Sequence, residues 1–104
     1  MKYFVSVLVL RRVYRCIHDI IYDLLLNLSE NQPLRKTKLC SLSNLPLDRC
    51  NVLIKLLIDR GLVFERVIEG KRYYEISDRG YEYIALYNKL NEIIDLKSHF
   101  VSNY

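Results

Sequence analysis

The change of sequence pattern at Gly61 is the feature that most constrains the fold of this chain. Before Gly61, apolar residues recur at spacings of three and four, which is the period of amphipathic helices. After it, residues 62–68 and 71–76 are rich in β-branched and aromatic residues, as strands are. Gly70 between these runs suits a tight hairpin turn. The pattern therefore predicts an α+β fold in which helices precede a β-hairpin.

The first expected helix spans residues 13–28. Its polar end is closed by Pro33, which cannot continue a helix. The apolar residues at helical spacing in this segment are Ile17, Ile20, Ile21, Leu24, Leu25 and Leu28.

Two further helices are expected before Gly61. A short one covers about residues 35–43, with an apolar face formed by Leu39, Cys40 and Leu42. Asn44 tolerates left-handed backbone angles and suits the turn that follows. The next helix begins at Pro46 or Leu47 and ends at Arg60, where Gly61 supplies a left-handed cap. Its buried stripe is Cys50, Leu53, Ile54, Leu57 and Ile58, and its outer side holds Arg49, Asn51, Val52, Lys55 and Asp59.

A last helix is expected from Ser77, the N-cap, toward Tyr104. At that extent it is roughly 35 to 40 Å long, which exceeds what so small a domain can cover. Its far half leaves an apolar stripe in water unless a second chain covers it. We therefore expect a homodimer, with dimerisation residues Tyr83, Tyr87, Leu90, Ile93, Ile94, Phe100 and Val101.

The chain of 104 residues is long enough for one domain. Residues 13–80 are assigned to a winged helix-turn-helix, residues 81–104 to the dimerisation helix, and residues 1–12 to an apolar segment packed on the domain or dimer. The apolar run in residues 1–12 is too short for a membrane span, and no cleavage site of a signal peptide follows it. A cytoplasmic protein is expected, with an amphipathic membrane anchor at 1–12 as the alternative.

The stretch from Ile20 to Leu90 resembles archaeal winged-helix transcriptional regulators, which archaeal viruses also encode. The resemblance rests on residues 20–23, Asn44-Leu45, Gly61-Leu62-Val63 and, most specifically, residues 70–80. It implies that the helix from about 46 to 60 reads the major groove and that the hairpin, the wing, contacts the backbone or minor groove. It also implies an antiparallel coiled-coil dimer through the last helix. Arg35 and Lys38 depart from the family, which usually has a capping Ser or Thr and an acidic residue there.

The formal net charge of +4 favours partners that carry phosphate. The expected partner is double-stranded DNA, bound in a sequence-specific manner, and the interface residues are Arg35, Lys36, Lys38, Arg49, Asn51, Lys55, Lys71, Arg72 and Tyr73. Any one of these cations can also be an ordinary solvated residue. The alternative function is a protein-protein interaction module on the same fold.

The remaining chemistry of the sequence does not favour an enzyme. No phosphate-binding glycine loop, nucleophile elbow or catalytic carboxylate pair is evident, and no cofactor or small-molecule ligand is expected. His18 and His99 lack partners at metal-ligand spacing. Our first interpretation of Cys16, Cys40 and Cys50 is that they are small buried apolar residues. Since hyperthermophiles form intracellular disulfides, Cys40 could also pair with Cys50, or Cys16 across the dimer axis.

Overall fold

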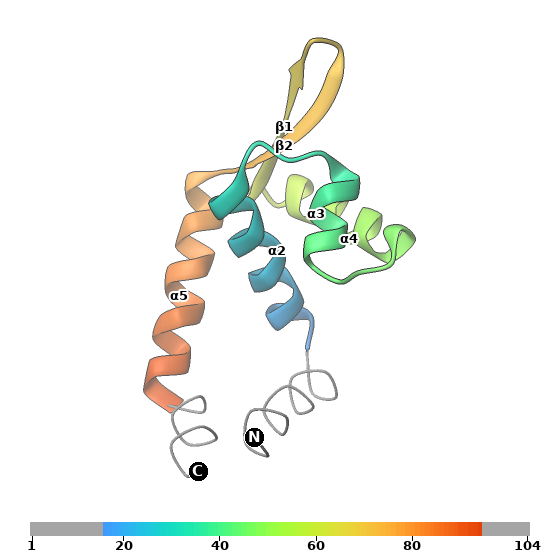
Figure 1. Ribbon diagram of the computed structural model, residues 1–104. Helices are drawn as coiled ribbons and strands as arrows, with labels where there is room; N and C mark the ends of the chain where they lie inside the picture. Colours follow the sequence, from blue (N-terminus) through green and yellow to red (C-terminus); the bar gives the residue numbers. More distant parts are fainter. Residues whose placement is uncertain (1–15, 95–104) are drawn as a thin grey trace.

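The computed structural model describes residues 16–94 (Figure 1). Predictions for residues 1–12, His99, Phe100 and Val101 therefore lie outside the described residues. Along the chain follow α2 (Ile17–Asn31), α3 (Lys36–Leu42), α4 (Leu47–Asp59), β1 (Val63–Ile68), β2 (Lys71–Ile76) and α5 (Asp78–Ile94). The two strands form an antiparallel sheet, so the α+β winged helix-turn-helix fold is confirmed. No helix within residues 16–94 is long and apolar enough to cross a membrane.

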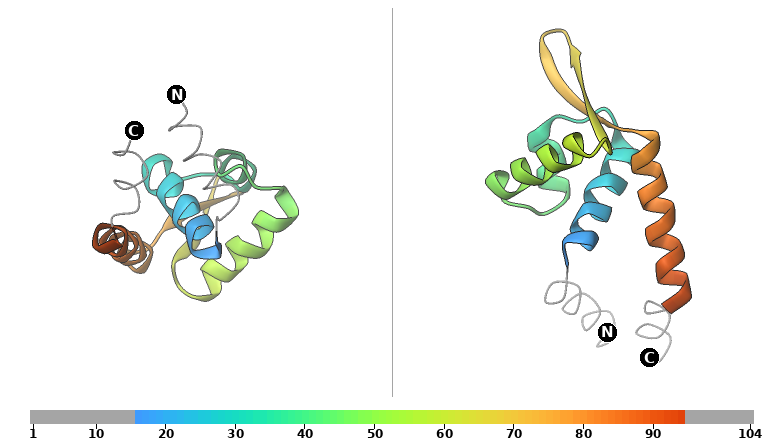
Figure 2. Two further views of the ribbon diagram at one scale, coloured as in Figure 1. Left: turned by 90° about the horizontal axis from the view of Figure 1, so that it is seen from below. Right: turned by 180° about the vertical axis from the view of Figure 1, so that it is seen from behind.

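Helix α2 occupies the centre of the molecule. It packs against α3 and α5, and α4 and α5 lie on opposite sides of it (Figure 2). The buried side chains of α2 are Ile20, Ile21, Leu24, Leu25 and Leu28, as the spacing predicts, whereas Ile17 at the start of the same apolar face is 49% exposed.

The predicted bounds of α2 are wrong at both ends. Cys16 has extended backbone angles, and its N–H donates to the carboxylate of Asp19, so the helix begins at Ile17 and not at residue 13. At the other end, the side chains of Ser29 and Asn31 donate to carbonyls within the helix. The helix therefore continues through its polar stretch to Asn31.

Helix α3 is short and buries Leu39 and Cys40. Leu42, predicted on the same face, is instead 38% exposed. Ser43 takes the buried position, where its hydroxyl accepts a hydrogen bond from Asn27 Nδ2 at 3.0 Å. Asn44 then adopts the predicted left-handed conformation, with φ 55°.

The end of α4 forms a Schellman motif. The N–H of Leu62 donates to the Leu57 carbonyl and the N–H of Gly61 to the Ile58 carbonyl, with Gly61 at φ 75°. Gly61 therefore has its predicted role. Because Leu62 belongs to this helix end, β1 starts at Val63, one residue later than expected.

The β-hairpin projects beyond the helical body as a wing (Figure 1). Its register runs from Val63 opposite Ile76 to Ile68 opposite Lys71. Glu69 and Gly70 have φ values of 50° and 77°, as in the two-residue type I′ turn that matches strand twist. The wing is buried only near its base, so its tip is available to a partner.

Helix α5 starts from a cap at Ser77, as predicted. The Ser77 hydroxyl accepts from the Gly80 N–H at 3.1 Å and donates to the Gly61 carbonyl at 2.6 Å. A Cβ at Gly80 would meet the Ile76 side chain and would lie 2.5 Å from the Leu62 carbonyl oxygen. Only glycine therefore allows α5 to approach the strands this closely.

Tyrosines join α5 to α2. The rings of Tyr22 and Tyr87 stack with centroids 4.0 Å apart, and the Tyr83 hydroxyl donates to the His18 carbonyl at 2.8 Å. The Tyr87 hydroxyl donates to the Asp19 carboxylate. These contacts occur within one chain, and the predicted part of Tyr83 and Tyr87 in dimerisation stays a prediction.

The cysteines differ in environment. Cys40 and Cys50 are buried and form a disulfide between α3 and α4, with Cα atoms 5.8 Å apart. Cys16 is exposed, so its prediction as a buried residue is wrong. Cys16 precedes α2 rather than lying on its inner face, which accounts for the difference. A bridge from Cys16 across a dimer axis stays a prediction.

Candidate nucleic-acid interface

A cationic hollow lies between the start of α3 and the tip of the wing. Its volume is about 400 Å³, and its lining residues are Arg35, Lys36, Thr37, Gly70, Lys71, Arg72 and Tyr74. Four cations predicted for the interface are thus brought together from segments more than thirty residues apart in sequence. We call this surface the cationic hollow.

Contacts with the wing fix the position of Arg35 at the start of α3. Leu34 forms an isolated β-bridge with Tyr74 of β2, which places Arg35 directly beside the sheet. The guanidinium carbon of Arg35 lies 5.9 Å from the ring centroid of Tyr73, within cation–π range. Tyr73 therefore has a positioning contact with Arg35, whereas its own contact with DNA stays a prediction.

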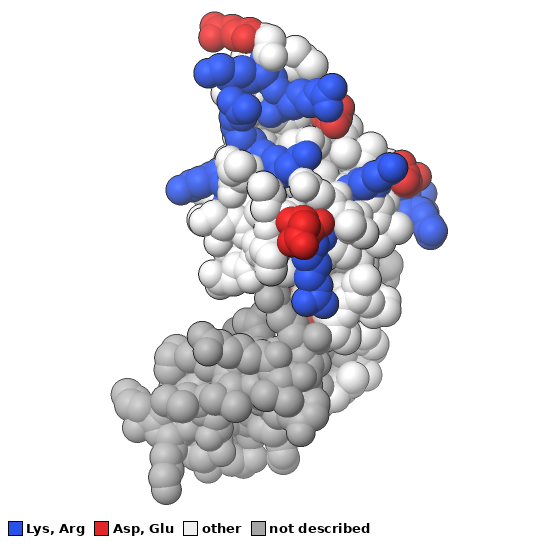
Figure 3. Space-filling model, turned by 90° about the vertical axis from the view of Figure 1, so that its right-hand side faces the viewer, with Lys and Arg blue, Asp and Glu red and all other residues white. Residues whose placement is uncertain are grey.

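The wing keeps two of its three cations unpaired. Arg66 binds Glu75 at 2.8 Å, and this hydrogen bond to a carboxylate raises the pKa of the Arg66 guanidinium. Lys71 and Arg72 are exposed, and no carboxylate within residues 16–94 forms an ion pair with either. Figure 3 shows Lys and Arg side chains gathered toward the wing end of one face, with few acidic groups among them.

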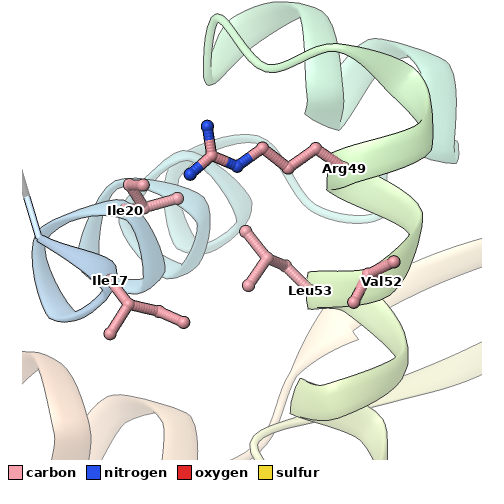
Figure 4. A pocket seen from close by; sticks show the side chains of 5 residues that line it. All are labelled: Ile17, Ile20, Arg49, Val52 and Leu53. Atoms are coloured by element: carbon pink, nitrogen blue, oxygen red, sulfur yellow. The ribbon is translucent and has the colours of Figure 1, made fainter.

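The predicted residues of α4 do not join the cationic hollow. Lys55 is exposed on the outer side of the helix, as expected. Asn51 is half-buried, and its Oδ1 is buried without a hydrogen-bond partner within residues 16–94, so it is less exposed than expected and its contact with DNA stays a prediction. Arg49 extends toward α2 over a separate pocket (Figure 4). Lys38 is exposed on α3 but does not line the hollow.

Sequence reasoning missed one residue of the cationic hollow and one residue at the start of α4. Thr37 lines the cationic hollow, and its place between Lys36 and Lys38 was a signal that could have identified it. Asp48 is exposed in the first turn of α4, where a carboxylate is favoured by the helix dipole. It makes the start of α4 less cationic than the predicted set implied.

Within the described residues, no group of three or more His, Cys, Asp or Glu side chains could hold a metal ion. The chemistry of this surface is therefore that of exposed cations, a hydroxyl and a projecting hairpin. Such groups bind phosphate oxygens and position a protein on a duplex.

The fold and the cationic hollow define a winged helix-turn-helix protein, the class that includes many DNA-binding transcriptional regulators. The chain belongs to the winged helix-turn-helix family, whose sequence model matches residues 15–97. In this arrangement α3 and α4 form the helix-turn-helix and α4 occupies the place of the recognition helix. No curated protein matches the sequence.

Solved structures with the same fold come from bacteria and an archaeon. A MarR family transcriptional regulator from Silicibacter pomeroyi has a TM-score of 0.70 at 23% identity, over 82% of this chain and 57% of that one. A probable transcriptional regulator from Pseudomonas aeruginosa has a TM-score of 0.67 at 16% identity, over 81% and 64%. The DNA-binding protein Sso10a-2 from Sulfolobus solfataricus has a TM-score of 0.62 at 18% identity, over 85% and 94%.

The chain spans less than two thirds of the length of the two bacterial regulators. At these identities the likeness shows a shared fold. The archaeal or viral origin implied by the sequence resemblance stays a prediction.

Proposed function

We propose that this protein is a transcriptional regulator that binds double-stranded DNA in a sequence-specific manner. The observation that carries the proposal is the cationic hollow, where Arg35, Lys36, Lys71 and Arg72 converge without a carboxylate partner in residues 16–94. In the proposed complex α4 enters the major groove, and the wing lies along the backbone or in the minor groove, where Arg72 can insert.

The hollow and α4 have different tasks in this proposal. Phosphate contacts from the hollow fix the protein on the duplex without reading sequence, whereas α4 contacts base edges. Lys55 on the outer side of α4 is suited to a guanine or a phosphate. Asp48 in its first turn is suited to accept from the amino group of a cytosine.

We further propose that the protein acts as a homodimer through α5. Leu86, Leu90 and Ile93 follow one another at helical spacing on α5, and Leu86 and Ile93 are 63% and 74% exposed. In an antiparallel pairing about Leu90, Leu86 packs against the partner's Ile94. Lys89 and Glu92 project from other sides of α5 than Leu90 and take no part in this pairing.

Salt dependence of DNA affinity tests the DNA-binding proposal. We expect a dimer to neutralise on the order of ten phosphates, so log affinity falls steeply with log salt concentration. Arg72→Gln removes one contact per protomer and should lower that slope by about two for the dimer. Lys89→Gln is the matched control, because α5 lies across α2 from α4 and the same charge is lost there.

The same experiment separates DNA binding from the protein-interaction alternative. Gel-shift titrations at two salt concentrations, with DNA selected from random duplexes, give both slope and preference. Absence of binding at low salt, or equal loss with Arg72→Gln and Lys89→Gln, contradicts the proposal and favours a protein-interaction module. A change of preferred sequence with Lys55→Gln or Asp48→Asn, without a comparable change for Arg72→Gln, supports base reading by α4.

A further inference from the structure

A second pocket lies between the start of α2 and the first half of α4. It has a volume of about 260 Å³ and is lined by Ile17, Ile20, Arg49, Val52 and Leu53. Figure 4 shows Ile17, Ile20 and Leu53 around the gap between the two helices, with Val52 against the α4 ribbon and the guanidinium of Arg49 reaching across the gap from α4. This pocket is separate from the cationic hollow, since the two share no lining residue.

The apolar walls of the pocket face water. Ile20 and Leu53 are buried, but Ile17 is 49% exposed and Val52 is 68% exposed. Large aliphatic side chains around a concave surface favour an apolar occupant, because contact removes their area from water. The walls of the pocket therefore favour a ligand with a hydrocarbon group.

Arg49 adds a single charge to this apolar site. It is exposed, and no residue in the described part of the chain forms an ion pair or a hydrogen bond with it. A guanidinium offers a planar pair of donors that matches a carboxylate in a bidentate manner. The site therefore combines an aliphatic wall with an unused carboxylate-binding group.

We propose that this pocket binds a short-chain organic carboxylate, with its acyl chain on Ile17, Val52 and Leu53 and its carboxylate on Arg49. If each heavy atom takes about the 30 Å³ of a liquid water molecule, the six carbons and two oxygens of hexanoate roughly fill the space. An inorganic anion leaves the aliphatic walls in water, and an organic cation is repelled by Arg49.

A carboxylate bound in this pocket would contact two parts of the molecule. Helix α2 packs on α5, and α4 packs on α3 and β1, so the pocket lies where the α2–α5 unit meets the helix proposed to enter the major groove. A bound carboxylate neutralises Arg49 on the flank of α4. Resting on the proposed function, the inference is that carboxylate binding weakens the affinity of the protein for DNA.

Binding is tested directly on the full chain without DNA. Hexanoate is titrated while amide chemical shifts are followed by NMR, with hexanamide as the neutral analogue. We expect saturable shifts that are largest around the pocket residues, and at least tenfold weaker binding of hexanamide, since it lacks the charge-assisted contact. Equal binding of hexanamide, or no saturation at millimolar hexanoate, overturns the proposal.

Two arginine variants make the test specific to the site. Arg49→Gln should weaken hexanoate binding about tenfold or more, whereas Arg60→Gln, an exposed arginine on the end of the same helix, should leave it unchanged. Equal effects of the two variants overturn the proposed contact. The amide spectrum of each variant without ligand shows whether it is folded.

Gel-shift titrations with hexanoate distinguish failure of this inference from failure of the proposed function. Hexanoate should lower DNA affinity of the wild-type protein and have no effect on Arg49→Gln. If hexanoate binds at the pocket but DNA does not bind at all, the proposed function fails while the carboxylate site stands. If DNA binds and hexanoate binds without changing DNA affinity, the coupling between the sites is overturned.

Discussion

Leu34 and Tyr74 exchange two backbone hydrogen bonds. The Tyr74 N–H donates to the Leu34 carbonyl at 2.8 Å, and the Leu34 N–H donates to the Tyr74 carbonyl at 3.1 Å. Leu34 thereby acts as a single-residue third strand beside β2. Since Arg35 follows it directly, the position of the first cation of α3 is set by the wing. Changes that loosen this junction should therefore affect both stability and the cationic hollow.

Gln32 strengthens the same junction, and Gln32→Ala should destabilise the protein. Its Oε1 accepts from the Ile76 N–H at 2.9 Å, and its Nε2 donates to the Tyr81 hydroxyl at 3.2 Å. Truncation leaves the partly buried Ile76 N–H without this acceptor, at a cost of about 1–2 kcal/mol in the free energy of unfolding. Urea unfolding followed by circular dichroism measures the change.

Glu30→Ala is the control for this variant. Glu30 is exposed near the end of α2, and a change there should move the free energy of unfolding by less than about 0.5 kcal/mol. Equal destabilisation by Glu30→Ala and Gln32→Ala would show that the side-chain bonds of Gln32 contribute nothing to the junction.

The disulfide between Cys40 and Cys50 should stabilise the helix-turn-helix. It closes a loop across a sequence separation of ten residues. Loop-closure entropy in the unfolded chain predicts a loss of about 2–3 kcal/mol in the free energy of unfolding when the bridge is reduced. Thermal unfolding with and without reductant measures this difference, and the mass of the intact chain under alkylation counts the free thiols.

Cys16→Ser serves as the comparison, because Cys16 is exposed and lies outside the helix-turn-helix. It should keep the full effect of reductant, whereas a Cys40→Ser/Cys50→Ser double variant should show none. Three alkylated thiols in protein purified without reductant would contradict the bridge.

Local backbone chemistry made parts of the fold predictable. Asn44 and Gly61 predict left-handed backbone positions, Gly70 predicts the hairpin turn, and Ser77 predicts the start of a helix. Each of these signals acts over a few residues, so neighbouring sequence is sufficient to read it.

The missed features depend on contacts between distant segments. Leu42 has the right residue type for a core face, but Ser43 is buried because Asn27 on α2 supplies its hydrogen bond. Nothing near Arg49 in sequence indicates that its side chain extends toward α2. The cationic hollow was predictable as a set of charges. Its shape was not, because it requires the bridge of Leu34 to Tyr74 forty residues later.

Leu90→Glu should dissociate the proposed dimer. Leu90 is exposed on α5 in the single chain, so a carboxylate there costs little in the monomer, whereas at a two-fold axis it places two buried like charges against each other. We expect light scattering to report twice the chain mass for the wild type and the single chain mass for Leu90→Glu.

Val67→Glu is the matched control for this apolar-to-acid change. Val67 is also exposed, at 66% against 55% for Leu90, but it lies on the wing, so its variant should remain dimeric. A dimeric Leu90→Glu protein would contradict the α5 interface, and a wild-type protein of single-chain mass would contradict the dimer itself.

Alkaline pH should destabilise the protein in part through Tyr83. Burial, followed by the charges of Cys16 and Asp19, raises the pKa of the Tyr83 hydroxyl from 10.0 to about 12. The unfolded chain therefore loses this proton first, so the contribution of Tyr83 to stability is complete below pH 10 and disappears as pH rises through about 12.

Tyr83→Phe tests this contribution. The variant should lose the hydrogen bond to the His18 carbonyl at neutral pH, and its free energy of unfolding should fall less steeply at alkaline pH. Tyr74, whose pKa is raised by burial and by Glu65, should contribute part of the pH dependence of stability in both proteins. Urea unfolding at about pH 9 and about pH 11 isolates the Tyr83 contribution as the difference between wild type and variant. Parallel alkaline losses in the two proteins would show that the Tyr83 hydroxyl is not held in its neutral form by the contact between α2 and α5.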